Sequence, residues 1–330
     1  DKSADLEEND TPNFASGWIR RVNISVTIFI IRRILQAAVV TLITLSVVFV
    51  VGRVVGDPVR IVIGIEAEEV RVQQVRDQLG LNDPLSVQYW KFMTGALRGE
   101  MGISFWTRTP TMPMVLERLP ATLYLGVVTA LLAFPLAILL GATAALKPHS
   151  WADRLINITA LGGVSIVEFW LALMLILVVA VQIGWFKTSG YGGAEYVILP
   201  ALTLAYKPIG RISQMARSAI IDELRKPYIK AARAKGLSEK QVVFTHALKN
   251  AAIPIITTTG DEIATILNGA MVVETVFGWP GVGLLTINAL SRRDLPLVEA
   301  TVFVVTGMII ITNMLLDVAY TYLNPRIRFQ

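Results

Sequence analysis

The sequence contains no cysteine, only two histidines and few charged residues. Without cysteine, a disulfide framework, a zinc site built on thiolates and a thiol nucleophile are excluded. Asp, Glu, Lys and Arg make up 17% of the 330 residues, whereas 54% are hydrophobic; a typical soluble domain has about 25% charged residues. No Walker-type Gly-x4-Gly-Lys-Ser/Thr run occurs, so no phosphate loop for ATP is expected. These absences argue against a pair of soluble domains and indicate that lipid surrounds much of the chain.

Six long apolar segments are present, each near or above the roughly 20 residues that cross a hydrocarbon core of about 30 Å. Because unpaired backbone groups are not left in lipid, each segment is expected to be an uninterrupted helix, with Pro135 and Pro208 kinking rather than ending it. The first segment is too long for a signal-peptide core of roughly 7 to 15 residues, so it is expected to stay attached. The expected spans are 28–51, 123–146, 155–183, 198–221, 251–273 and 298–320.

Lysine and arginine are concentrated on one side of these spans. The loop from Ile221 to Asn250 has seven basic and three acidic residues. Basic residues also precede the first span and lie within the C-terminal tail. The long 52–118 segment, on the other side, has basic and acidic residues in equal number. Positive-inside reasoning therefore places both termini in the cytoplasm.

The spans divide the chain into tails, a core and one long insertion. The insertion is expected to be a small extracytoplasmic cap of two helices, Glu66–Leu79 and Pro84–Leu97, separated by a stop at Gly80. Such helices either cover the bundle or receive a partner protein. The expected parts are an acidic cytoplasmic tail (1–27), the first span (28–51), the cap (52–121), the transmembrane core (122–320) with its cytoplasmic loop (222–250), and a C-terminal cytoplasmic tail (321–330).

The basic loop between the fourth and fifth spans is predicted to fold as helix, tight turn, helix. Good helix formers run from Ile229 to Lys235, Gly236 suits a left-handed helix stop, and Ser238 with Gln241 forms a capping-box pattern. Three alanines in the first helix permit close approach to another protein, and the basic residues around them supply charge complementarity. An ordinary cytoplasmic loop with positive-inside charge has a similar composition, so this pattern alone leaves both interpretations open.

The same loop carries a family resemblance. The run Lys230-Ala-Ala-Arg-Ala-Lys-Gly236, followed by His246-Ala-Leu-Lys-Asn250, resembles the EAA loop of bacterial ABC importer permeases, the element that docks on the ATP-hydrolysing subunit. Lys230 departs from the Glu that the name of the loop implies. Together with stretches over nearly the whole chain, it resembles the B-type permease of the dipeptide, oligopeptide and nickel uptake systems. Those stretches are 80–89, 117–123, 169–173, 272–281 and 324–328.

The resemblance implies an all-helical membrane protein with the type I ABC importer permease fold in the bacterial inner membrane. It implies no catalytic residue, metal or cofactor in this chain, with ATP and Mg bound by two partner ATPase subunits. The other implied partners are a homologous C-type permease, an extracytoplasmic solute-binding protein and membrane lipid, but no nucleic acid. The implied function is alternating-access import of dipeptides or oligopeptides, with nickel chelates, opines, glutathione or other small solutes as alternatives.

The resemblance also assigns residues to the ATPase-coupling surface. Ala231 and Ala232 are expected to sit in a groove of the ATPase, with charged and aromatic side chains around them. Gly236 is expected to let the coupling element turn. The full set of expected coupling residues is Arg225, Tyr228, Ala231, Ala232, Arg233, Gly236 and His246.

Several ionisable residues fall near mid-depth of the expected spans, where they are costly and usually face a bundle interior or a water-filled path. Helical phase places Lys207 and Arg211 on one polar stripe. One interpretation is that these charges neutralise one another, or pair with the partner permease, and fix helix packing. The other is that they line the path and favour a solute with positive charge or a zwitterion. The candidate path residues are Glu168, Lys207, Arg211, Asp261, Glu262 and Asn268.

Two other protein classes remain as alternatives. An ion-gradient-driven secondary transporter has similar spans and buried charges, but internal repeats and interrupted helices are expected there, and the sequence does not clearly show them. A membrane-embedded enzyme needs a catalytic constellation in lipid, whereas His149 and His246 both fall in expected cytoplasmic loops. Dependence of uptake on ATP and a binding protein separates the importer from the secondary transporter.

Overall fold

A computed structural model of the chain describes residues 14–54, 69–78 and 82–323. Within these ranges the regular structure is helical, apart from one isolated antiparallel bridge between Ile103 and Pro110. The helices before the basic loop are α1 (Phe14–Val54), α3 (Glu69–Gln78), α4 (Leu85–Arg98), α5 (Thr111–Leu146), α6 (Trp151–Ser165), α7 (Glu168–Leu175), the π-helix η1 (Ile176–Gln182) and α8 (Ala194–Leu224). The remaining helices are α9 (Pro227–Ala234), α10 (Glu239–Gln241), the π-helix η2 (Val242–Ala247), α11 (Leu248–Asn250), α12 (Ala252–Phe277), α13 (Val282–Ser291) and α14 (Leu295–Leu323).

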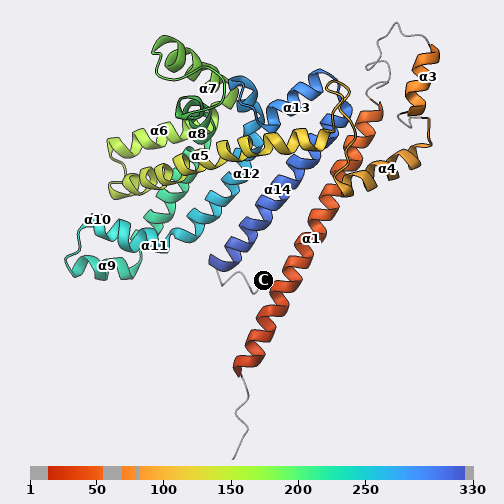
Figure 1. The fold of residues 1–330 in the computed structure, drawn as a ribbon. Coiled ribbons are helices and arrows are strands. Elements are labelled where there is room, and N and C mark those ends of the chain that lie inside the picture. The colour runs from red at the N-terminus through yellow and green to blue at the C-terminus, as the bar shows by residue number, and fades with distance from the viewer. Residues whose placement is uncertain (1–13, 55–68, 79–81, 324–330) are drawn as a thin grey trace, which may run out of the picture.

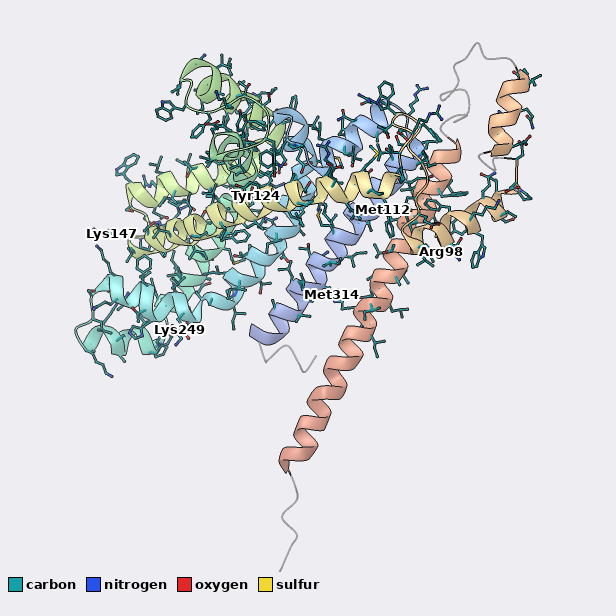
Figure 2. The ribbon with its side chains drawn as sticks, viewed as in Figure 1. Arg98, Met112, Tyr124, Lys147, Lys249 and Met314 are labelled. Carbon is teal, nitrogen blue, oxygen red and sulfur yellow. The ribbon has the colours of Figure 1, made fainter. Side chains whose placement is uncertain are left out.

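The bundle has two distinct ends (Figure 1). Helices α9, α10 and α11 lie beyond the C-terminal end of α5, at what we call the loop end. The N-terminal ends of α5 and α14 lie beside the C-terminal part of α1, at the insertion end. Lys147 and Lys249 mark the loop end in Figure 2, and Met112 marks the insertion end. The basic loop and the long insertion therefore lie at opposite ends of the bundle.

Helix α8 lies at the centre of the bundle and packs against α5, α6 and α12. Glycines make this close packing possible. A Cβ added at Gly141 of α5 would collide with Ala216 of α8, and one added at Gly210 of α8 would collide with the backbone of Ala160 in α6. Small residues at such contacts let helix backbones approach closely, which is how membrane helices gain packing energy without a hydrophobic driving force.

Helix α1 stands at the edge of the bundle and packs against α14 and α4. Arg33 of α1 forms an ion pair with Asp317 of α14, with 2.7 Å between Nη2 and Oδ1. Nearer the insertion end, Ser46 Oγ lies 2.8 Å from the hydroxyl of Tyr89 in α4. Both expected helices of the insertion are present as α3 and α4, and α4 packs on α1 rather than extending over the whole bundle. The expected stop at Gly80 lies outside the described residues.

One of the expected spans is broken, so the expectation of an uninterrupted helix is wrong for 155–183. This segment breaks at Ile166, whose backbone is extended (φ −79°, ψ 130°), and its two parts are bent by more than 40°. The fifth expected span is unbroken from Ala252, but its helix continues past residue 273 to Phe277, ends at Gly278 with φ 59°, and turns by 67° into α13. Irregular backbone at such depth is tolerated where protein surrounds it. Interrupted helices therefore do not distinguish this chain from a secondary transporter.

The helix boundaries refine the span count. Among the described residues, α1, α5 and α14 each contain a segment long and apolar enough to cross a membrane, and the count rises to five if each bent pair is one span. Helix α8 occupies the remaining expected span and carries Lys207 and Arg211 in its middle. Helix α5 starts at Thr111 and continues through Pro120 and Pro135, so the domain boundary expected at 121–122 falls inside a helix. Pro135 does not end α5 and Pro208 does not end α8, as expected.

Candidate functional site

Helix α9 of the basic loop has one face turned inward and one outward. Pro227 stands at the start of the helix, where its missing N–H has no cost. Ile229 and Ala232, three residues apart, are buried, whereas Tyr228 and Ala231 are exposed. Ala232, which was expected in a groove of a partner, is turned by helical phase toward the chain's own core. Ala231 and Ala234 are the small residues that this helix presents outward.

The inward face of α9 anchors the loop to the bundle. Ile229 and Ala232 belong to a buried hydrophobic cluster that also contains Val243 of η2, Ile220 of α8 and Ala142 of α5. Because interiors pack densely, a displacement of α9 is transmitted to the helices that share this cluster. The loop is thus mechanically connected to the ends of α5 and α8.

The turn after α9 has the predicted geometry. Gly236 adopts a left-handed conformation with φ 83°, and no atom lies within 4 Å of the position that a Cβ would take. Ser238 caps α10 by accepting a hydrogen bond from the Gln241 N–H, while the Gln241 side chain accepts one from the Ser238 N–H, which completes the capping box. The sequence prediction of helix, tight turn and second helix is confirmed.

Polar contacts join the two ends of the loop and also bridge its central turn. Tyr228 donates a hydrogen bond to Glu223 Oε2 (2.8 Å) and accepts one from Asn250 Nδ2 (3.0 Å), so it connects α8, α9 and α11. Burial raises the pKa of the Tyr228 hydroxyl, which remains a donor at neutral pH. Arg233 forms a bidentate pair with Glu239 across the turn, at 2.7 and 3.0 Å. The Arg233 guanidinium lowers the pKa of the Glu239 carboxyl, which stays ionised.

A cavity of about 390 Å³ lies between the loop, the C-terminal ends of α5 and α8, and the turn that follows α5. Arg217 and His149 are among its lining residues, and so are the expected coupling residues Arg225 and Arg233. His246 is half-buried in η2, and its carbonyl accepts a hydrogen bond from Asn250. In the described part of the chain, no group of three or more His, Cys, Asp or Glu residues is arranged to hold a metal ion.

The second candidate site lies inside the bundle, where α7, α8 and α12 meet. Arg211 of α8 and Glu262 of α12 form an ion pair with 2.7 Å between Nη1 and Oε1. The Glu262 side chain is fully buried, whereas 48% of the Arg211 side chain is exposed. Of the other expected path residues, Lys207 is half-buried, and Asp261 and Asn268 are exposed.

Glu168 also belongs to this region, although no ion pair of it is seen in the described part of the chain. Its carboxylate, at the first residue of α7, lies against Gly269 of α12, where a Cβ would collide with it. Leu204 of α8 borders the same position. The six expected path residues thus come from three packed helices, and Arg211, Asp261 and Asn268 are the ones with exposed side chains.

One buried carboxylate was not identified from the sequence. Glu274 of α12 accepts hydrogen bonds from Thr122 Oγ1 (2.6 Å) and from the backbone N–H groups of Gly283 (2.7 Å) and Leu284 (3.2 Å). It therefore caps the N-terminal end of α13 and holds the bend between α12 and α13. A glutamate followed by two close glycines, Gly278 and Gly281, is the signal that could have indicated a helix break with its own acceptor.

The chain is similar to known transport proteins over most of its length. Residues 137–329 match the family described as "Binding-protein-dependent transport system inner membrane component", and residues 26–126 match the N-terminal part of such membrane components. The glutathione transport system permease protein GsiC of Salmonella paratyphi A is 36% identical over 303 residues, with 92% of this chain and 99% of that protein covered. GsiC of Escherichia coli K12 is 35% identical over the same share of both chains.

A solved structure supports the same fold. An inward-facing crystal form of the MetNI methionine ABC transporter contains a chain that superposes with a TM-score of 0.52 at 16% identity. The match covers 64% of this chain and 97% of that one. The broken helices, the central α8 and the basic loop are thus parts of a type I ABC importer permease fold. The chain belongs to the family of binding-protein-dependent transport system inner membrane components, the permease subunits of ABC importers.

Proposed function

We propose that this chain forms half of the translocation pathway of an ATP-driven importer for glutathione or short peptides. The observation that carries the proposal is the similarity to GsiC over 92% of the chain. Glutathione and peptides share an amine, carboxylates and amide groups, so a path for them needs polar groups of both signs. Nickel chelates and opines remain alternative solutes for a permease of this type.

The charged residues of the second candidate site, where α7, α8 and α12 meet, form a charged cluster that is suited to solutes of this kind. Arg211 reaches the exposed side of α8 while Glu262, fully buried behind it, compensates its charge. A half-exposed guanidinium can therefore bind a solute carboxylate without leaving an isolated cation in the membrane. Asp261 is exposed on the neighbouring α12 and supplies the opposite charge for an amine. Glu262, in this proposal, positions Arg211 rather than touching the solute.

The proposed coupling to ATP hydrolysis uses the outward face of α9. Two cytoplasmic ATPase subunits bind there, and a homologous permease completes the pathway. Ala231 is exposed on this face, and Tyr228 and Arg233 are exposed at its two edges. Movement of α9 is passed to α5 and α8 through the buried cluster that contains Ile229 and Ala232. The loop end is then cytoplasmic and the insertion end extracytoplasmic, with the solute-binding protein on that side.

Reconstitution of the complete complex in proteoliposomes tests the proposal. Uptake of labelled glutathione and of a labelled dipeptide is measured with ATP enclosed, with and without the solute-binding protein. We expect uptake only with both ATP and the binding protein. Uptake driven by a proton or sodium gradient in the absence of ATP would contradict the proposal.

The proposed path is tested separately with Asp261→Asn, since Asp261 is exposed and its replacement leaves the Arg211–Glu262 pair intact. We expect reduced uptake and a changed ranking of cationic, zwitterionic and anionic peptides. Glu195→Gln is the matched control, because Glu195 is an exposed acid in the first turn of α8, outside the cluster. An unchanged substrate ranking for Asp261→Asn would remove this residue from the path.

A further inference from the structure

An arginine patch lies at the insertion end, remote from the charged cluster and the basic loop. It comprises Trp106 and Arg108 in the 103–110 loop, and Arg292 and Arg293 in the turn between α13 and α14. All four side chains are exposed, and Trp106 is 65% exposed. The Arg292 guanidinium carbon lies 4.1 Å from the centre of the Trp106 ring, in a cation–π contact. The patch thus combines three permanent positive charges with an aromatic surface.

A buried carboxylate holds the two parts of the patch together. Asp294 is 1% exposed and accepts hydrogen bonds from the backbone N–H groups of Phe105 (3.0 Å) and Trp106 (3.3 Å). It also accepts one from Ser104 Oγ at 2.5 Å. Within the 103–110 loop, Ser104 N–H donates to the Thr109 carbonyl at 2.9 Å. The patch is therefore built on a fixed backbone, although it lies in loops.

Two arginines of the patch stand where the backbone favours other residues. Arg108 has φ 59° and Arg293 has φ 54°, both in the left-handed region. A residue with a Cβ is strained there, whereas glycine takes this conformation freely and asparagine or aspartate tolerates it. Arginine at both positions is therefore not explained by the turns themselves. Strained residues held by a fixed surrounding structure are found most often at functional sites.

In the described part of the chain, the charges of the patch have no ionic partner. Among the residues that the structure describes, Arg108, Arg292 and Arg293 form no ion pair. The exposed acids nearest in sequence to the 103–110 loop, Glu100 and Glu117, do not pair with them. Unpaired exposed guanidinium groups beside a tryptophan have the composition of interface hot spots.

From this geometry we infer that the arginine patch is a docking surface for a carboxylate-rich face of the solute-binding protein. The inference rests on the proposed function, which puts the insertion end on the side where that protein approaches. Arginine forms bidentate contacts with carboxylates, and Trp106 offers apolar area that becomes buried on docking. Charges of this kind raise the association rate and fix the orientation of the partner. The docked partner lies over the turn that begins α14, next to α13 and the bend with α12.

The left-handed backbone permits a clean test of the patch. The double variant Arg108→Asp/Arg293→Asp reverses two charges at positions where aspartate adds no backbone strain, and Arg108→Asn/Arg293→Asn removes them in the same conformation. Lys187→Asp is the control, since Lys187 is exposed in the loop between η1 and α8. The complete complex in nanodiscs is titrated with the purified, solute-loaded binding protein, and stimulation of ATP hydrolysis is measured at several salt concentrations.

We expect the aspartate variant to raise the half-saturating concentration of binding protein at least about tenfold, and the asparagine variant to raise it less. Basal ATP hydrolysis of the patch variants remains at the wild-type level. The half-saturating concentration of binding protein for Lys187→Asp also remains at the wild-type level. The wild-type complex loses affinity as salt rises, and the asparagine variant loses less. An unchanged half-saturating concentration in both variants, or an equal loss with Lys187→Asp, overturns the inference.

The nanodisc composition separates a protein partner from lipid. If the patch instead binds anionic headgroups, the variants change the dependence on phosphatidylglycerol content and leave the titration with binding protein unaltered, which also overturns the inference. If the wild-type complex is not stimulated by the binding protein at all, the proposed function fails rather than the patch alone.

Discussion

Arg211 and Glu262 are joined by an ion pair of 2.7 Å between α8 and α12, although one side chain is half exposed and the other fully buried. The two oxygens of Glu262 have no hydrogen-bond partner besides this contact in the described part of the chain. The buried carboxylate therefore depends mainly on the Arg211 guanidinium for compensation, with the Lys207 ammonium as a second, weaker positive charge. A relationship of this kind fixes the position of Arg211 and sets the relative register of two helices.

Removal of either partner of this pair is expected to destabilise the permease more than removal of both. Arg211→Gln leaves an uncompensated buried carboxylate, and breaking a buried pair in this way costs about 3–5 kcal/mol. The double variant Arg211→Gln/Glu262→Gln removes both charges and is expected to recover much of the loss. Thermal unfolding of the purified complex, arranged as a double-mutant cycle, measures the coupling. If the stability losses of the two single variants add up to the loss of the double variant, the coupling energy is zero and the ion pair does not stabilise the permease.

Glu274→Ala is expected to destabilise the bend between α12 and α13 strongly. The change leaves the Thr122 hydroxyl and the N–H groups of Gly283 and Leu284 without their acceptor, and each buried unsatisfied group costs about 1–3 kcal/mol. Glu274→Gln keeps a carbonyl oxygen that can accept from the two N–H groups, so its loss is expected to be much smaller. Thermal unfolding and hydrogen exchange over 275–285 measure both. Equal losses in the two variants would mean that the negative charge, rather than the acceptor, is required.

The sequence allowed much of the fold to be predicted because its main signals are local. Apolar length located the helices, and Gly236 with the Ser238–Gln241 capping box located the turn after α9, since both features act within a few residues. The break near Ile166 was missed because hydropathy reports apolar length and does not register a bend within an apolar segment, and the bend at Gly278 lies beyond the span that was expected to end at residue 273. The acceptor at the bend, Glu274, binds Thr122 of α5, which is 152 residues away in the sequence, and no local pattern reports that contact.

The candidate site was predicted in composition but not in orientation. Counting residues brought Arg211 and Glu262 to a similar depth, and the structure joins them. It also separates them by exposure, which depends on how α8 and α12 are rotated within the bundle. The same limit explains Ala232, because a helix of alanines and basic residues has small residues on every side. Only packing against Val242 and Val243 decides which alanine is buried.

Tyr228→Phe is expected to weaken the coupling of ATP hydrolysis to transport with little loss of assembly. The hydroxyl connects Glu223 at the end of α8 to Asn250 in α11, so its removal breaks two hydrogen bonds of about 1 kcal/mol each. The ring remains and keeps its packing. The ratio of ATP hydrolysed to solute imported is the measurement, and we expect it to rise. A ratio at the wild-type value would show that this connection does not hold the loop during the transport cycle.

Ala231→Trp and Ala232→Trp, adjacent substitutions on one helix, are expected to fail in different ways. Ala231 is exposed, so tryptophan there leaves the fold intact but blocks close approach of the ATPase, and the ATPase is expected to be lost on co-purification. Ala232 is buried in the cluster with Ile229, so tryptophan there overfills the core, at a cost of about 1–3 kcal/mol or more. Thermal unfolding of the isolated permease separates the two, since only Ala232→Trp lowers its stability. Retention of a fully active ATPase by Ala231→Trp would show that the outward face of α9 is not where the ATPase binds.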